Sequence, residues 1–235
     1  MNYRYVTSVM NIGREKSHIS CRKISFYSNG IPVLKRDMGD SAPVVYGNVP
    51  GCDKELSFHD IVRAVGVDNF NDMERLRASH HWPGVQGELT WYAPLQWTKL
   101  WLLAKELEDD KSLEAVYWID SGIPTHGFFS AAPLASHKIV EGFHVSLSPM
   151  RGGGWHGLNM HRLFDGIDRR VQGGLFGGTR QDVLSVGQKA FEFLRWCLSK
   201  GVVPLDEDFL SYHYLSPLPC YIAHAGFGEW IKAHV

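Results

Sequence analysis

A chain of 235 residues is long enough for one large domain or two small ones, and its 44% apolar and 21% charged residues are ordinary for a globular protein. The formal net charge of −1, from 24 basic and 25 acidic side chains, gives no support for binding a nucleic acid backbone. No run of about 18 apolar residues is present, so no membrane span is expected. Four cysteines without CxxC spacing favour reduced thiols in a cytoplasmic protein.

The order of the predicted elements indicates the fold class. Apolar, β-branched and aromatic runs predict strands over residues 3–12, 31–37, 43–49, 116–119, 143–150, 171–178 and 220–223. Helical spacing of apolar residues predicts helices over residues 56–66, 70–80, 95–110, 179–201 and 206–216. Such alternation favours an α/β fold with a mainly parallel central sheet flanked by helices. Without a convincing linker or an internal repeat, residues 1–235 are predicted to form one Rossmann-like domain.

One carboxylate stands out by its position. The apolar run Val-Tyr-Trp-Ile at 116–119 ends in Asp120, and Ser121, Gly122 and Pro124 then turn the chain. In open α/β sheets, ligands bind beyond the carboxyl ends of the strands. Asp120 is therefore a candidate functional acid. The alternative is that its carboxylate only caps the following turn.

Three further segments place polar residues at similar points. Arg14 follows the first predicted strand, where a diphosphate would bind, although alone it is also an ordinary surface cation. His224 ends a short apolar strand and precedes a glycine-bearing turn, as a metal ligand or a surface histidine does. Asp206, Glu207 and Asp208 open a helix, where acids complement the helix dipole and cap free N–H groups. Three acids in a row exceed what a helix cap needs, which favours a functional role for at least one of them.

Several common motifs are absent. The segment Gly-Gly-Leu-Phe-Gly-Gly at 173–178 is not GxGxxG and does not follow the first strand, so a dinucleotide fingerprint is rejected. The sequence also contains no GxxxxGK[ST] phosphate loop, no GxSxG nucleophile elbow and no HExxH zinc helix.

Four segments follow one another along the chain: "RYVTSVMNIGRE", "WTKLWLLAKELEDD…AVYWIDSGI", "VQGGLFGGTRQDVLSVGQKAFEFL" and "PLDEDFLSYHY". Taken in this order, they resemble the bacterial HtrL/WlaTC-like family of glycosyltransferases. The match covers most of the chain in patches, and residues 124–165 are unmatched. "WIDSG" and "GGLFGG…DE", in this order, are its specific parts.

The same order is similar, more distantly, to GT-A glycosyltransferases of the glycogenin and galactosyltransferase type. Asp120 matches the first acid of their Asp-x-Asp motif, whereas Gly122 replaces the second. Lys99 matches their helix Lys or Arg. His224 and Trp230 resemble their late histidine and tryptophan.

The resemblance implies transfer of a sugar from a nucleotide-sugar, most simply a UDP-sugar, to a saccharide or other hydroxyl acceptor. Asp120 and His224 are then expected to hold Mn²⁺ or Mg²⁺ against the donor diphosphate. Arg14, Lys99 and Trp230 are expected on the donor side. Gly173 and Gly174 would let the backbone approach the sugar.

Asp206, Glu207 and Asp208, ranked in this order, are expected to act near the reacting carbon or the acceptor. Three alternatives stay open at this point. One is a catalytically silent relative that binds a nucleotide or sugar. The second is an enzyme for nucleotidyl or phosphoryl transfer, and the third is a transferase acting on a modified nucleobase, which the near-neutral charge does not support. The sequence does not indicate the oligomeric state.

Overall fold

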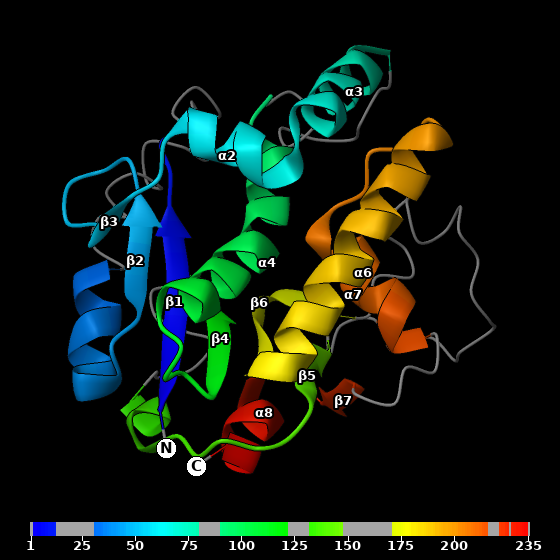
Figure 1. The fold of residues 1–235 in the computed structure, drawn as a ribbon. Coiled ribbons are helices and arrows are strands. Elements are labelled where there is room, and N and C mark those ends of the chain that lie inside the picture. The colour runs from blue at the N-terminus through cyan, green and yellow to red at the C-terminus, as the bar shows by residue number, and fades with distance from the viewer. Residues whose placement is uncertain are drawn as a thin grey trace.

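The computed structural model describes residues 2–12, 31–79, 90–121, 132–147, 171–215, 221–225 and 227–234. Within these residues, all strands join one seven-stranded sheet in the order β3-β2-β1-β4-β6-β5-β7 (Figure 1). The strands are β1 (Tyr3–Val9), β2 (Val44–Gly47), β3 (Lys54–Glu55), β4 (Ala115–Ile119), β5 (Phe143–Leu147), β6 (Val171–Thr179) and β7 (Tyr221–His224).

All strands except β6 point the same way. β1 pairs in parallel with β2 and β4, β2 pairs in parallel with β3, and β5 pairs in parallel with β7. β6 is antiparallel to both of its neighbours, β4 and β5. The predicted α/β fold with a mainly parallel sheet is therefore confirmed.

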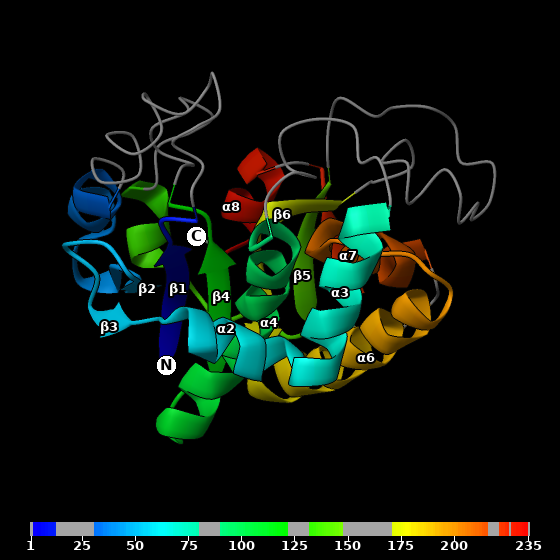
Figure 2. The same ribbon diagram turned by 90° about the horizontal axis from the view of Figure 1, so that it is seen from above.

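Helices cover both faces of the sheet (Figures 1 and 2). The larger hydrophobic cluster packs one face against α2 (Phe58–Val65), α3 (Val67–Ser79), α4 (Tyr92–Asp109), α6 (Arg180–Ser199) and α7 (Asp206–Leu215). The smaller cluster packs the other face against a helix over residues 31–38, the 3₁₀ turn η5 (Ala132–Ser136) and α8 (Phe227–His234). A further 3₁₀ turn, η2, spans Gly39–Ser41. Among the described helices, none combines the length and the apolar character that crossing a bilayer requires.

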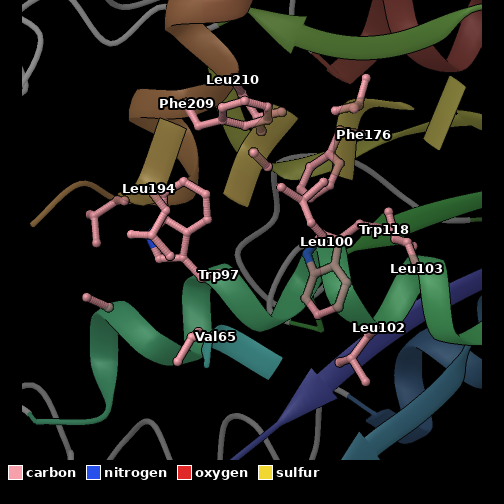
Figure 3. Packing of buried hydrophobic residues seen from close by; sticks show 14 of the residues in the cluster. Val65, Trp97, Leu100, Leu102, Leu103, Trp118, Phe176, Leu194, Phe209 and Leu210 are labelled. Carbon is pink, nitrogen blue, oxygen red and sulfur yellow. The ribbon is translucent and has the colours of Figure 1, made fainter. Parts of the chain in front are cut away.

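β4 is apolar throughout because hydrophobic clusters cover it on both faces of the sheet. Val116 and Trp118 belong to the cluster on the α4 face, whereas Tyr117 and Ile119 belong to the cluster on the α8 face. A strand covered on both faces needs apolar residues at every position. On the α4 face, the Trp118 ring stacks on Phe176 with the ring centres 6.4 Å apart, and α4 packs over both (Figure 3).

The strand predicted over residues 31–37 is wrong, because residues 31–38 are helical. Ile31, Leu34 and Met38 are the buried apolar residues of this segment. Their i, i+3, i+7 spacing places them on one side of a helix. The short run Ile-Pro-Val-Leu concealed this period.

A buried acid ties the first three strands to α4. The Glu106 side chain on α4 is fully buried, and its Oε2 accepts a hydrogen bond from Arg4 Nη1 of β1 at 2.7 Å. Its Oε1 accepts hydrogen bonds from the Tyr46 hydroxyl of β2 and the Lys54 ammonium of β3. Burial alone raises the pKa of Glu106, but these donors outweigh burial and hold that pKa below its ordinary value.

We expect Glu106→Gln to destabilise the protein by about 2 kcal/mol at pH 7, because it leaves two cations without their shared anion. Arg4 and Lys54 retain some solvent, which keeps the loss below that for a fully buried pair. The low folded-state pKa means that the stabilisation is present above the unfolded pKa of about 4.3 and disappears as the pH falls through the folded pKa. Urea unfolding between pH 3 and pH 7 measures both effects.

Glu108→Gln is the matched control, since Glu108 is exposed on the same helix. It should change the free energy of unfolding by less than about 0.5 kcal/mol. Equal stability of the Glu106→Gln and Glu108→Gln variants across this pH range would show that the buried acid does not tie the strands together.

Candidate functional site

The order of the strands points to one edge of the sheet. From β1 the chain moves outward through β2 and β3, and β4 then lies on the other side of β1. The order therefore reverses between β1 and β4, and ligands of open α/β sheets bind beyond the carboxyl ends of the strands at such a point. Asp120 directly follows β4 at this edge. Its backbone N–H donates to the Gly174 carbonyl of β6 at 2.8 Å, which fixes the turn.

Lys99 of α4 is the centre of the site. Its Nζ lies 3.5 Å from Asp120 Oδ1 and 3.0 Å from Asp206 Oδ2. The same ammonium donates to the Gly173 carbonyl at 2.9 Å. The Lys99 side chain is only 7% exposed, so these groups replace most of its water. One buried cation thus brings together β4, β6 and α7.

Trp118 orients the Asp120 carboxylate. The indole Nε1 donates to Asp120 Oδ1 at 2.7 Å, and Lys99 Nζ lies 5.5 Å from the centre of the Trp118 ring. Trp118 and Asp120 are two residues apart along an extended chain, so their side chains leave it on the same side. The Asp120 side chain remains 43% exposed, which makes it a well-oriented acid that is accessible to a ligand.

The three acids at the start of α7 have different surroundings. Asp208 Oδ2 accepts a hydrogen bond from the Leu205 N–H at 2.7 Å, which is a capping contact. Glu207 Oε1 accepts from the Gly173 N–H at 3.0 Å, and Glu207 is partly exposed. Asp206 is 1% exposed and meets Lys99 at ion-pair distance, yet among the described residues its two oxygens have no aligned hydrogen-bond donor.

The charges of Lys99, Asp120, Asp206 and Glu207 shift the pKa values of Lys99 and Asp206. Burial, followed by the nearby Glu207 and Asp120 carboxylates, raises the pKa of Asp206 to about 6 even though Lys99 favours its ionised form. Burial lowers the pKa of Lys99, but Asp120, Asp206 and Glu207 together outweigh burial and raise that pKa above its ordinary value. Lys99 therefore keeps its proton, and the protonation of Asp206 changes at about pH 6.

Gly173 permits the close packing of the cluster. A Cβ at this position would lie 2.6 Å from Asp206 Oδ2, 3.0 Å from Glu207 Cγ and 3.3 Å from Lys99 Nζ. Among the described residues, the close neighbours of Gly173 are thus the acids and the lysine, and the predicted approach of its backbone to a sugar stays a prediction.

The structure brings together six of the residues that the sequence selected: Lys99, Asp120, Gly173, Gly174, Asp206 and Glu207. Asp208 is next to them but faces its own helix start. Arg14 and Gly122 lie outside the described residues. The sequence analysis missed Trp118, for which the two-residue spacing to Asp120 was the available signal.

His224 and Trp230 lie elsewhere. Trp230 is fully buried in the hydrophobic cluster on the α8 face, where its ring stacks on His234 with the centres 3.7 Å apart. β6 and β5 separate β4 from β7, so the backbones that carry Asp120 and His224 are about 14 Å apart at the usual strand spacing. A shared metal ion on Asp120 and His224 stays a prediction, and this geometry does not favour it.

Comparisons with known proteins give structural matches only. No family model and no curated protein matches the chain. One similar solved structure is a glycosyltransferase involved in the glycosylation of the major capsid of PBCV-1, with 10% identity, a TM-score of 0.41 and coverage of 96% of this chain and 82% of that chain. Another is mouse xyloside xylosyltransferase 1, with 8% identity, a TM-score of 0.44 and coverage of 95% and 85%. Both of these proteins are glycosyltransferases.

Gly173→Ala should destabilise the protein by about 1–3 kcal/mol, because the new methyl group overlaps the buried ion pair. Gly187→Ala on α6 is the matched control, since a Cβ there meets nothing within 4 Å. That control should stabilise the protein by about 0.5–1 kcal/mol through helix propensity. Chemical unfolding of both variants tests the contrast, which fails if the two substitutions have the same sign.

The raised pKa of Asp206 predicts a specific pH dependence. The folded state holds the proton more tightly than the unfolded state, whose Asp pKa is about 3.9. The contribution of Asp206 to the free energy of unfolding should therefore fall as the pH rises from about 4 to about 6. Asp206→Asn removes this fall, so its melting temperature relative to the wild type should increase across that interval.

Glu108→Gln serves again as the control and should follow the wild type at each pH, since this exposed carboxylate lies outside the cluster. Parallel melting curves of Asp206→Asn and the wild type over the interval would remove the assignment of a titrating, buried Asp206.

Proposed function

We propose that this protein is a glycosyltransferase that moves a sugar from a nucleotide-sugar, with UDP as the favoured nucleotide, to a saccharide or other hydroxyl acceptor. The observation that carries the proposal is the position of Asp120. It is a partly exposed carboxylate at the reversal point of the strand order, and Trp118 and Lys99 orient it. The hydrogen bond from the Asp120 backbone N–H to the Gly174 carbonyl fixes the turn that carries it. The sequence resemblance supplies the class of reaction, and this geometry supplies an acid where a donor would bind.

The described residues fit a hard divalent cation at Asp120. Mg²⁺ commonly takes one or two carboxylates and completes its shell with water and substrate phosphate oxygens. A single exposed carboxylate at the edge of the sheet fits that mode, and the missing acid at Gly122 does not preclude it. When bound, Mg²⁺ or Mn²⁺ would act as a Lewis acid for the departing diphosphate. In this proposal Asp120 is the protein ligand among the described residues.

Lys99 and Asp206 act as positioning residues in this proposal. Lys99 is nearly buried and Asp206 is 1% exposed, so neither presents an open face to a substrate. Their ion pair instead holds α7 against β6, and Lys99 holds the Asp120 carboxylate in place. Because three carboxylates surround one ammonium, the cluster carries net negative charge whether or not Asp206 is protonated. That charge suits recruitment of a cation.

Glu207 is the acid of α7 that we propose to contact the sugar or the acceptor. Ranking by sequence put Asp206 first, but of the three acids only Glu207 is partly exposed. Its hydrogen bond from the Gly173 N–H fixes one carboxylate oxygen. The group can then orient an acceptor hydroxyl or stabilise positive charge that develops on the sugar.

A second candidate is a protein that binds a nucleotide-sugar without transferring the sugar. The observation that favours it is the 3.5 Å approach of Lys99 Nζ to Asp120, which already supplies a cation to that acid. In that case donor binding would need no added metal, and no nucleoside diphosphate would be released.

The decisive experiment incubates a panel of nucleotide-sugars with the purified protein and Mn²⁺ and measures the release of the nucleoside diphosphate. Wild-type protein should release UDP from at least one donor, and excess EDTA should abolish the release. Asp120→Asn should lower turnover by about 100-fold or more, as expected for the loss of an electrostatic stabiliser, without unfolding the protein. Glu108→Gln, on an exposed surface, should retain wild-type turnover.

Glu207→Gln separates binding from chemistry. It should lower turnover by about 100-fold while it leaves the metal-dependent affinity for UDP near the wild-type value, whereas Asp120→Asn should weaken that affinity. UDP binding that is equal with Mn²⁺ and with excess EDTA, together with no release from any donor, would support the binding protein instead. Full turnover in both variants would exclude this edge of the sheet as the active site.

A further inference from the structure

Three histidines meet on the face of the sheet opposite α4, the helix that carries Lys99. His144 of β5 alternates with Phe143 and Val145, which face α4, and therefore points to the α8 side. His224 ends β7, and His234 lies at the end of α8. One ring nitrogen from each of these three residues, which we call the histidine cluster, lies within 4.8 Å of the others.

The hydrogen bonds of His144 assign its tautomer. Its Nε2 lies 3.0 Å from the Glu141 carbonyl and 3.3 Å from the Val140 carbonyl. A carbonyl only accepts, so Nε2 carries the hydrogen and Nδ1 carries a lone pair. Nδ1 points to His224 Nε2 at 2.9 Å. The side chain is fully buried, so the direction of this lone pair is fixed by the fold.

In His234, too, one ring nitrogen donates to a backbone carbonyl and the other carries a lone pair, but the two nitrogens exchange roles. Its Nδ1 lies 2.7 Å from the Trp230 carbonyl one helical turn earlier, which assigns the hydrogen to Nδ1 and a lone pair to Nε2. This Nε2 is buried and has no hydrogen-bond partner in the part of the chain that the structure describes. A buried polar atom without a partner costs free energy and calls for an explanation.

We propose that the histidine cluster binds one transition-metal ion of the Zn²⁺ class through three imidazole nitrogens. In protein metal sites, a ligating histidine usually donates its other ring N–H to a carbonyl or carboxylate, as His144 and His234 both do. The ion would accept the buried lone pair of His234 and replace the direct contact between His144 and His224. Burial also lowers the pKa of all three histidines and so favours the neutral, ligating form.

The ligand set defines which metal fits. Three imidazoles without a carboxylate suit Zn²⁺, Co²⁺, Ni²⁺ or Cu²⁺, whereas Mg²⁺ and Ca²⁺ need oxygen ligands. The site therefore differs in chemistry and in place from the cation proposed at Asp120. His144 and His234 are fully buried, and only His224 is partly exposed, so the ion would enter from the His224 side. Once bound, it would join β5, β7 and α8.

The first test titrates untagged, chelator-treated protein with Co²⁺ and then displaces it with Zn²⁺. We expect one Co²⁺ per chain with the d–d absorption of a four-coordinate ion, and loss of that absorption on addition of Zn²⁺. His224→Ala should weaken Zn²⁺ binding by at least about 100-fold, since even loss of an outer-shell partner costs about 10–100-fold. His59→Ala, which removes an exposed histidine, should bind Zn²⁺ as the wild type does.

The second test needs no substitution in the core. X-ray absorption of the zinc-loaded wild-type protein should show imidazole scattering from about three histidines at a zinc–nitrogen distance of about 2.0–2.1 Å. Three outcomes would overturn the proposal: no stoichiometric Zn²⁺ binding, unchanged binding by His224→Ala, or an oxygen-only shell around the metal. None of these outcomes depends on whether the protein transfers a sugar.

Discussion

The buried ammonium of Lys99 is the constraint on which the candidate site depends. A lysine that has lost most of its water must find anions and acceptors, and here they come from the turn after β4, the start of β6 and the first turn of α7. These three segments are distant in sequence. The need to satisfy one cation therefore fixes where the exposed Asp120 and Glu207 lie relative to each other. The same requirement makes a side chain larger than hydrogen at Gly173 destabilising.

α4 carries a second buried charge, of opposite sign, on the same side. Glu106 follows Lys99 by seven residues, or about two turns and 10.5 Å along the axis. Lys99 reaches the carboxyl edge of the sheet, whereas Glu106 meets Arg4, Tyr46 and Lys54 from β1, β2 and β3. Apolar packing presses α4 onto the sheet but does not select its position along the strands. Two buried charges with fixed partners at different points of the sheet do select it.

The local pattern of apolar, polar and glycine residues in the sequence was sufficient to predict most of the fold and part of the candidate site. Strand ends and glycines, together with the resemblance, selected Asp120, Lys99, Gly173, Asp206 and Glu207, and the structure brings them together. The helix at 31–38 was missed because four apolar residues in a row hide its period. The burial of Asp206 and Trp230, and the meeting of His144 with His234, depend on long-range packing and on the pairing of β5 with β7, which no local window contains.

The reversed direction of β6 has a consequence for how this protein can diverge. β5 ends beside the start of β6, where Leu147 pairs with Val171, at the edge of the sheet that carries Asp120. Both ends of the connection through residues 148–170 are therefore anchored there. Insertions and replacements in such connections are tolerated far better than changes in paired strands. A change in the length of this segment would therefore leave the register of the strands and the buried ion pair in place.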